Sequence, residues 1–176
     1  MRAIWRGGSQ AAGTADIEAA SFVQVLPIRV LASGMSTSGY SIVRADEVED
    51  DYAGSDVPGE FRSLKDALGT EQVAVTLIRI PPHSDFEQGS GHRHEELEEI
   101  YILTRGTLTM RFDKQIEEVA AGAVVRVAPE TIRSHRNEGE EPVEMWAISR
   151  RLEEHDSTKV EDFWEPSQQA AQRSQG

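Results

Sequence analysis

Alternation of apolar and polar residues is clearest in the second half of the chain. Between Thr107 and Phe112, apolar residues alternate with threonines and an arginine, the period of two that is typical of a half-buried strand. Val73 to Ile80 is a largely β-branched run that stops at Pro81-Pro82, which also predicts a strand. Three more strands are expected at Ala123 to Val127, Ile132 to Asn137 and Val143 to Ser149. Short strands at this spacing predict an all-β sandwich or barrel rather than a parallel α/β sheet.

The first half of the chain has weaker patterns. Residues 1–20 are rich in small residues without a sustained period, and residues 166–176 are rich in Gln, Ser and Ala; we expect both tails to be disordered. Ser21 to Leu31 and Tyr40 to Val43 favour strands, the acidic stretch from Asp46 to Glu60 favours a loop, and Phe61 to Leu68 favours a short helix. A chain of 176 residues suits one domain, which we place at residues 21–165.

Composition excludes several classes of function. The chain has no cysteine, which removes disulfides, thiolate metal sites and cysteine nucleophiles and makes a reducing cytoplasm the simplest location. A net charge of −13 argues against binding to a phosphate backbone, so we expect no nucleic-acid partner. No apolar window has the length of a membrane span, and no signal peptide is evident at the N-terminus, so we expect no membrane association.

Two histidines and a glutamate near the middle of the chain have the spacing of a metal site. His92 and His94 are two residues apart, so they project to one side of a strand. Glu99 has the wrong parity for an uninterrupted strand, and a bend through residues 95–97 must bring it back. Two imidazoles and a carboxylate form the facial triad that binds divalent iron and also suits manganese, nickel or zinc. The alternative is a solvated acidic hairpin, and we assign Glu95, Glu96 and Glu98 to such a surface.

The same residues carry a resemblance to a known family. His92, His94, Glu99 and Gly106 are spaced as His-x-His, four residues, Glu, six residues, Gly, which resembles the first motif of the cupin superfamily. The resemblance covers roughly residues 73 to 149 and implies a single-domain cupin: a small antiparallel β-barrel of the jelly-roll type, also called a double-stranded β-helix. It implies a divalent metal ion (iron, manganese, nickel or zinc) and a small-molecule ligand. It also implies a homodimer, for which Phe22 to Leu31 is the apolar segment available for strand exchange.

The second cupin motif fits at its ends, Gly122 and Asn137, and departs from the family in its middle. Arg133 stands at the place of the metal-binding histidine, and His135 lies two places later. Residues two apart on a strand differ by roughly 6.6 Å, so both cannot reach the metal from one backbone position. Two interpretations therefore remain: a three-ligand site beside Arg133, or a longer turn that makes His135 the fourth ligand. An interior His135 that only makes a hydrogen bond is a third.

Two further residues are candidates for contact with a substrate. A guanidinium at Arg133 can grip a carboxylate or enolate with two parallel hydrogen bonds, although an exposed arginine on a strand edge would look the same in sequence. Tyr101 lies on the face of Glu99 by parity and could donate a proton or simply fill the core. The arrangement predicts a metal-dependent enzyme for a small oxygenated or anionic metabolite, such as a dioxygenase or isomerase. A non-catalytic module that binds a small molecule or a metal is the alternative, because one fold hosts many chemistries.

Overall fold

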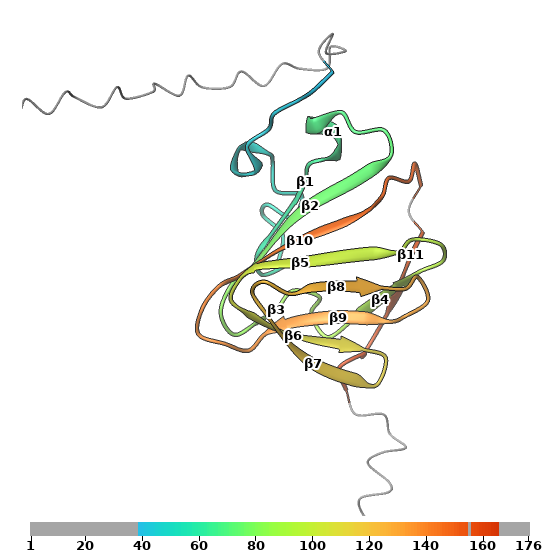
Figure 1. Ribbon diagram of the computed structural model, residues 1–176. Coiled ribbons are helices and arrows are strands. Elements are labelled where there is room, and N and C mark those ends of the chain that lie inside the picture. The colour runs from blue at the N-terminus through green and yellow to red at the C-terminus, as the bar shows by residue number, and fades with distance from the viewer. Residues whose placement is uncertain (1–38, 155, 166–176) are drawn as a thin grey trace, which may run out of the picture.

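Two antiparallel β-sheets face each other in the computed structural model, which describes residues 39–154 and 156–165 (Figure 1). The first sheet has the order β1-β2-β10-β5-β8; its strands are β1 (Glu60–Ser63), β2 (Val73–Ile80), β10 (Val143–Arg150), β5 (Glu99–Arg105) and β8 (Val124–Val127). The second has the order β11-β4-β9-β6-β7; its strands are β11 (Ser157–Val160), β4 (Gly91–His94), β9 (Arg133–Asn137), β6 (Thr107–Phe112) and β7 (Gln115–Ala120). A short strand, β3 (Ser84–Asp85), pairs with β9.

The all-β class and the jelly-roll arrangement are confirmed, with one refinement. In the described residues the edge strands of the first sheet, β1 and β8, do not pair with β11 or β7, the edges of the second. The two sheets therefore form a jelly-roll-like sandwich rather than a fully closed barrel. Side chains from both inner faces interdigitate between the sheets, as in other sandwiches. The most buried members of this core are Ile80, Tyr101, Leu103, Leu108, Met110, Val143 and Met145.

Several predicted elements differ from the structure. Tyr40 to Val43 is not a strand, and the predicted helix from Phe61 begins instead as β1, leaving only α1 (Lys65–Leu68) helical beside the single turn η1 (Ala45–Glu47). Pairing with β2 decides this, because Phe61 lies opposite Ile78 in the ladder. β7 and β11 were not predicted because both are largely exposed edge strands without an apolar face. The predicted strand from Ser21 to Leu31, with the dimer contact assigned to it, and both predicted tails lie outside the described residues.

Gly106, which ends the motif of His92 and Glu99, has a structural reason for its identity. Its φ of +78° lies in the left-handed region, which glycine adopts without a steric penalty. A Cβ atom at this position would also lie 2.9 Å from the carbonyl oxygen of Pro142. The glycine therefore allows the tight turn from β5 to β6, which carries the chain from the first sheet to the second.

Among the described residues, no helix is long and apolar enough to cross a membrane.

Candidate metal centre

The three predicted ligands come from two strands that lie in opposite sheets. His92 and His94 project from β4, while Arg93 between them is exposed. Glu99 is the first residue of β5. The connection through residues 95–98 crosses from one sheet to the other, which is how a residue of the wrong parity reaches the histidines. The bend predicted from the sequence is therefore present.

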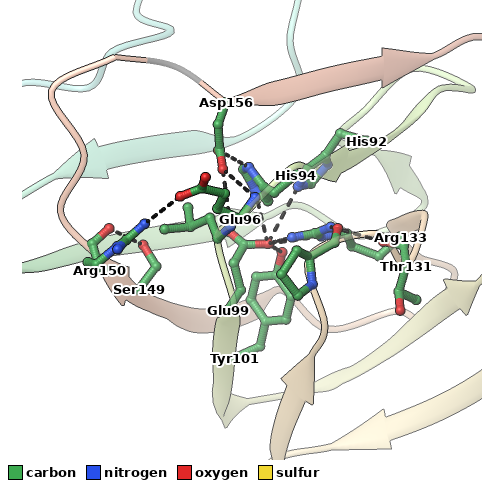
Figure 2. A network of polar contacts seen from close by, with 12 residues as sticks. His92, His94, Glu96, Glu99, Tyr101, Thr131, Arg133, Ser149, Arg150 and Asp156 are labelled. Carbon is green, nitrogen blue, oxygen red and sulfur yellow. Dashed lines mark hydrogen bonds and ion pairs between the residues drawn. The ribbon is translucent and has the colours of Figure 1, made fainter.

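The side chains of His92, His94 and Glu99 meet at one point inside the sandwich. One ligand atom from each lies within 4.8 Å of the other two. The Nε2 atoms of His92 and of His94 are each 3.6 Å from Oε2 of Glu99 (Figure 2). All three side chains are largely buried, and that of His94 is only 10% exposed. The interpretation as a solvated hairpin therefore does not describe these three residues, and the group could hold a metal ion.

A carboxylate holds each imidazole by the nitrogen that faces away from Glu99. Nδ1 of His92 lies 3.1 Å from Oε1 of Glu87, and Nδ1 of His94 lies 2.6 Å from Oδ1 of Asp156. Such a partner keeps the proton on Nδ1 and leaves the lone pair of Nε2 for a metal, as second-shell carboxylates do in metalloproteins. Nε2 of His94 is buried and has no hydrogen-bond partner. The donor set therefore fits a divalent cation.

Asp156 also organises the backbone around the site. Its Oδ2 accepts hydrogen bonds from the N–H groups of Glu96 and Leu97, both at 3.1 Å. These two residues belong to the connection between β4 and β5. Burial raises the pKa of Asp156, but hydrogen bonds from the Glu96 backbone and from His94 outweigh burial and lower it. One carboxylate thus ties together a candidate ligand, the crossing connection and the segment before β11.

Glu99 is the most densely bonded group of the site. Its Oε2 accepts hydrogen bonds from Nε and Nη2 of Arg133, at 2.9 and 2.6 Å, and from the hydroxyl of Tyr101, at 2.5 Å. Burial raises the pKa of Glu99, but the nearby rings of His92 and His94 and the charge of Arg133 hold it well below its usual range. The carboxylate is therefore ionised and fixed in place before any ligand arrives.

Arg133 faces the site, but most of its N–H groups already donate hydrogen bonds to acceptors of the protein. It lies opposite His92 in the pairing of β4 with β9, and its side chain is 0% exposed. Besides Glu99, its Nη1 donates to the carbonyl oxygens of Pro129 and Thr131, at 3.0 and 2.9 Å. Four of its five N–H bonds are thereby committed. Its predicted contact with a substrate stays a prediction, and the visible role of Arg133 is to neutralise Glu99.

His135 lies on the same face of β9 as Arg133 and Asn137, because residues two apart on a strand share a face, and all three are buried. It is 2% exposed, and burial lowers its pKa, so the ring is neutral near pH 7. It does not belong to the group of three side chains whose ligand atoms converge, and neither ring nitrogen has a hydrogen-bond partner. Its role as a fourth ligand stays a prediction.

Tyr101 is a core residue whose hydroxyl reaches the site. It is 2% exposed, and burial together with the charge of Glu99 raises its pKa well above the usual value. The hydroxyl therefore keeps its proton and donates a hydrogen bond to Oε2 of Glu99. Its predicted contact with a substrate also stays a prediction.

Two residues of the site, Glu87 and Asp156, were missed by the sequence analysis. Glu87 precedes His92 by only five residues, and this proximity in sequence was an available signal. Asp156 is separated from His94 by 62 residues and stands in a polar stretch, so no spacing connects them. Pairing of β11 with β4 places Ser157 opposite His94, and this brings Asp156 to the ring.

Comparisons with known proteins agree with this architecture. Residues 76–149 match a family model described as Cupin domain. That segment runs from β2 to β10 and includes every residue of the candidate site except Asp156. A comparison with curated protein sequences found no match.

Solved structures with similar folds come from several bacteria. A sugar phosphate isomerase of the cupin superfamily from Silicibacter pomeroyi is 23% identical, with a TM-score of 0.54, over 64% of this chain and 76% of that one. A cupin protein from Bacteroides fragilis is 21% identical, with a TM-score of 0.53, over 67% and 92%. A predicted oxalate decarboxylase from Thermotoga maritima is 24% identical, with a TM-score of 0.51, over 64% and 100%. At these identities the likeness shows the fold alone.

Proposed function

The chain belongs to the cupin superfamily, and we propose that its domain binds one divalent metal ion through His92, His94 and Glu99. The observation that carries this proposal is the convergence of two imidazole Nε2 atoms on one carboxylate oxygen, each at 3.6 Å. Nitrogen and oxygen ligands of this kind suit iron, manganese, nickel or zinc. His135 is a candidate for a fourth ligand only if the β9 backbone or its ring moves toward this group.

The protein residues around the three ligands would prepare the site for a cation. Glu87 and Asp156 orient the two rings, while Arg133 and Tyr101 fix the carboxylate of Glu99. Burial lowers the pKa of His92, but its hydrogen bond with Glu87 and the nearby charge of Glu99 raise it by more, to about 9. Without a metal, His92 therefore carries a proton near neutral pH, which a bound cation would displace. A bound divalent cation would polarise a carbonyl or enolate oxygen of a substrate.

We propose that the substrate is a small oxygenated or anionic metabolite and that the chemistry is of the dioxygenase or isomerase type. Two of the similar structures are described as a sugar phosphate isomerase and a predicted oxalate decarboxylase. Both act on small, oxygen-rich molecules by those descriptions, which supports the substrate class but not a particular reaction. A non-catalytic module would use the same site for binding alone.

Metal analysis of the protein purified without chelators tests the metal proposal. We expect one equivalent of a divalent transition metal in the wild type and almost none in His94→Ala. His83→Ala is the matched control, because the side chain of His83 is 58% exposed and lies outside the site; it should keep the full metal content. Full retention of metal in His94→Ala would place the site elsewhere, and absence of metal affinity in the wild type would contradict the proposal.

A variant with a smaller expected effect on metal affinity tests how His94 is oriented. Asp156→Asn keeps the shape of the side chain but exchanges the carboxylate that holds His94 for an amide. Removal of such second-shell partners typically costs about 10–100-fold in metal affinity, and we expect an effect of that size by competition with a fluorescent chelator. An unchanged affinity would show that Asp156 serves only the loop backbone.

Turnover separates the enzyme from the binding module. A metal-loaded enzyme should convert one of a panel of small hydroxy and oxo acids or sugar phosphates, and His94→Ala should abolish the conversion. A binding module would show thermal stabilisation by one of these compounds without conversion. A homodimer and a cytoplasmic location are further proposals, supported by the family resemblance and by the absence of cysteine; sedimentation analysis and cell fractionation would test them.

A further inference from the structure

Unsatisfied polar atoms gather beside the candidate metal centre. Among the described residues, the buried side-chain atoms without a hydrogen-bond partner are Oε2 of Glu87, Nε2 of His94 and both ring nitrogens of His135. A buried polar group without a partner costs about 1–3 kcal/mol, and native proteins hold few of them. A metal ion would satisfy His94. The atoms of Glu87 and His135 need another partner.

Glu87 and His135 lie next to each other and next to a metal ligand. Oε1 of Glu87 is 3.1 Å from Nδ1 of His92 and 3.5 Å from Nδ1 of His135. The two residues reach this place from different segments, Glu87 from the connection between β3 and β4 and His135 from the middle of β9. Their open atoms therefore form one polar cluster adjacent to the metal centre.

The surroundings hold this cluster in a fixed geometry. The ring of Phe86 stacks on His135, with centroids 5.5 Å apart and planes 19° apart. Asp85 anchors the loop, because its carboxylate accepts the backbone N–H groups of Glu87 and Gly89 and pairs with Arg136 at 2.8 Å. The contacts of Asp85 thereby hold the segment that carries Phe86 and Glu87 in place.

The atoms of Glu87 and His135 that lack a partner are best satisfied by hydrogen-bond donors of a ligand. A neutral imidazole has one N–H and one acceptor nitrogen. Nδ1 of His135 faces Glu87, so it is the natural position of the proton, and Nε2 then accepts. A carboxylate oxygen such as Oε2 of Glu87 also accepts. A ligand here must bring donors, whereas a carboxylate or phosphate would meet the acidic Glu87. An ammonium group would be repelled by the neighbouring metal cation, which leaves hydroxyl groups as the best match.

We propose that Glu87 and His135 form a subsite that binds hydroxyl groups of the ligand, beside the metal bound by His92, His94 and Glu99. This inference rests on the proposed metal function and narrows its substrate class. The ligand is a small polyhydroxylated molecule that places oxygen atoms on the metal and a hydroxyl group on Glu87 and His135. A dicarboxylate without a hydroxyl group, such as oxalate, is the wrong ligand.

Isothermal titration calorimetry on the metal-loaded full chain tests the subsite with matched probes. The probes are glycerate and erythronate, each compared with the ether in which the terminal hydroxyl is methylated. Both members of a pair offer the same carboxylate and α-hydroxyl to the metal and differ only in the terminal donor. We expect the ether to bind about tenfold more weakly for at least one chain length, the effect of one hydrogen bond to a charged group.

Two variants and a control connect this preference to the subsite. His135→Phe keeps a ring that stacks on Phe86 and removes both nitrogens, and Glu87→Gln removes the charge. Each should abolish the preference for the free hydroxyl. His135→Phe should keep the wild-type metal content, whereas Glu87→Gln also loses the carboxylate that holds His92 and should bind the metal about 10–100-fold more weakly, so it is titrated with ligand at saturating metal. Glu118→Gln, at an exposed position of β7, should keep the preference. If His135→Phe fails to fold, the effect of Glu87→Gln on the preference for the free hydroxyl decides whether the subsite exists.

The results distinguish this inference from the metal proposal. Bound metal with equal affinities for alcohol and ether at both chain lengths overturns the subsite and leaves the metal site intact. A preference that survives in both variants also overturns it. Loss of metal from a folded His135→Phe would make His135 a fourth ligand instead of a subsite residue. Absence of metal from the wild type would end the metal proposal and the subsite with it.

Discussion

The two sides of the candidate centre differ in how completely their polar groups are bonded. On one side, Oε2 of Glu99 accepts three hydrogen bonds from Arg133 and Tyr101. On the other, Glu87 and His135 leave three buried atoms without a partner. Buried polar groups are normally paired, so the saturated side, that of Glu99, is fixed by the protein itself, while the side with open atoms is the one to which we assign the ligand. Under the proposed function, the site would be rigid at the carboxylate of Glu99 and open where the substrate binds.

Arg133→Met is expected to have the largest effect, because it breaks the saturated side. The variant removes the charge that compensates Glu99 and leaves that carboxylate buried beside protonatable rings. Removal of one partner of a buried ion pair typically costs about 3–5 kcal/mol, and urea unfolding of the chelator-treated protein should show a loss of this size. Arg105→Met, whose side chain is 62% exposed, should change stability by less than about 0.5 kcal/mol. Equal effects would mean that Glu99 does not need Arg133.

The pH dependence of stability should reveal the extra proton that the ring of His92 carries between Glu87 and Glu99. The pKa of His92 is raised to about 9 in the folded protein, above the value near 6.5 of an unfolded chain. Its contribution to the free energy of unfolding is therefore fully present below pH 6.5 and lost as pH rises through about 9. Chelator-treated protein should lose stability across this window, and His92→Gln should lack that loss. A flat profile for the wild type would contradict the raised pKa.

Tyr101→Phe removes one hydrogen bond from the saturated side and little else. Hydrogen bonds to charged groups contribute about 1.5–3 kcal/mol, and we expect the unfolding free energy to fall by that amount. Tyr52→Phe is the control, since Tyr52 makes ring contacts with Phe61 and Phe86. A loss no larger than that of the control would show that Arg133 alone holds Glu99.

His135→Phe is expected to have the smallest effect, and one of opposite sign. It replaces a ring with two unpaired nitrogens by an apolar ring of similar shape, which can be neutral or stabilising. Thermal unfolding of the ligand-free variant should occur at the wild-type temperature or slightly above it. A marked destabilisation would show that the ring nitrogens are already satisfied without a ligand.

Much of the fold could be predicted from local patterns. The alternation in Thr107–Phe112 and the β-branched run in Val73–Ile80 correspond to β6 and β2 with the predicted bounds. The exposed edges were harder, because β7 buries almost nothing and shows no apolar face. Residues 61–63 are in β1 because β2 offers a partner, a long-range contact that overrides local preference.

The candidate site also has features that the local sequence predicts and features that depend on long-range contacts. The sequence by itself determined the types of the candidate ligands, the common face of His92 and His94 and the need for a bend before Glu99, because side-chain alternation is a property of each strand alone. Only the tertiary structure decided that Asp156 reaches His94, that Arg133 bonds to Glu99 and that Glu87 lies beside His135. Those contacts depend on how two sheets pack and how loops close between them. No spacing along one chain encodes such distances, since residues far apart in sequence meet only after the sheets have assembled.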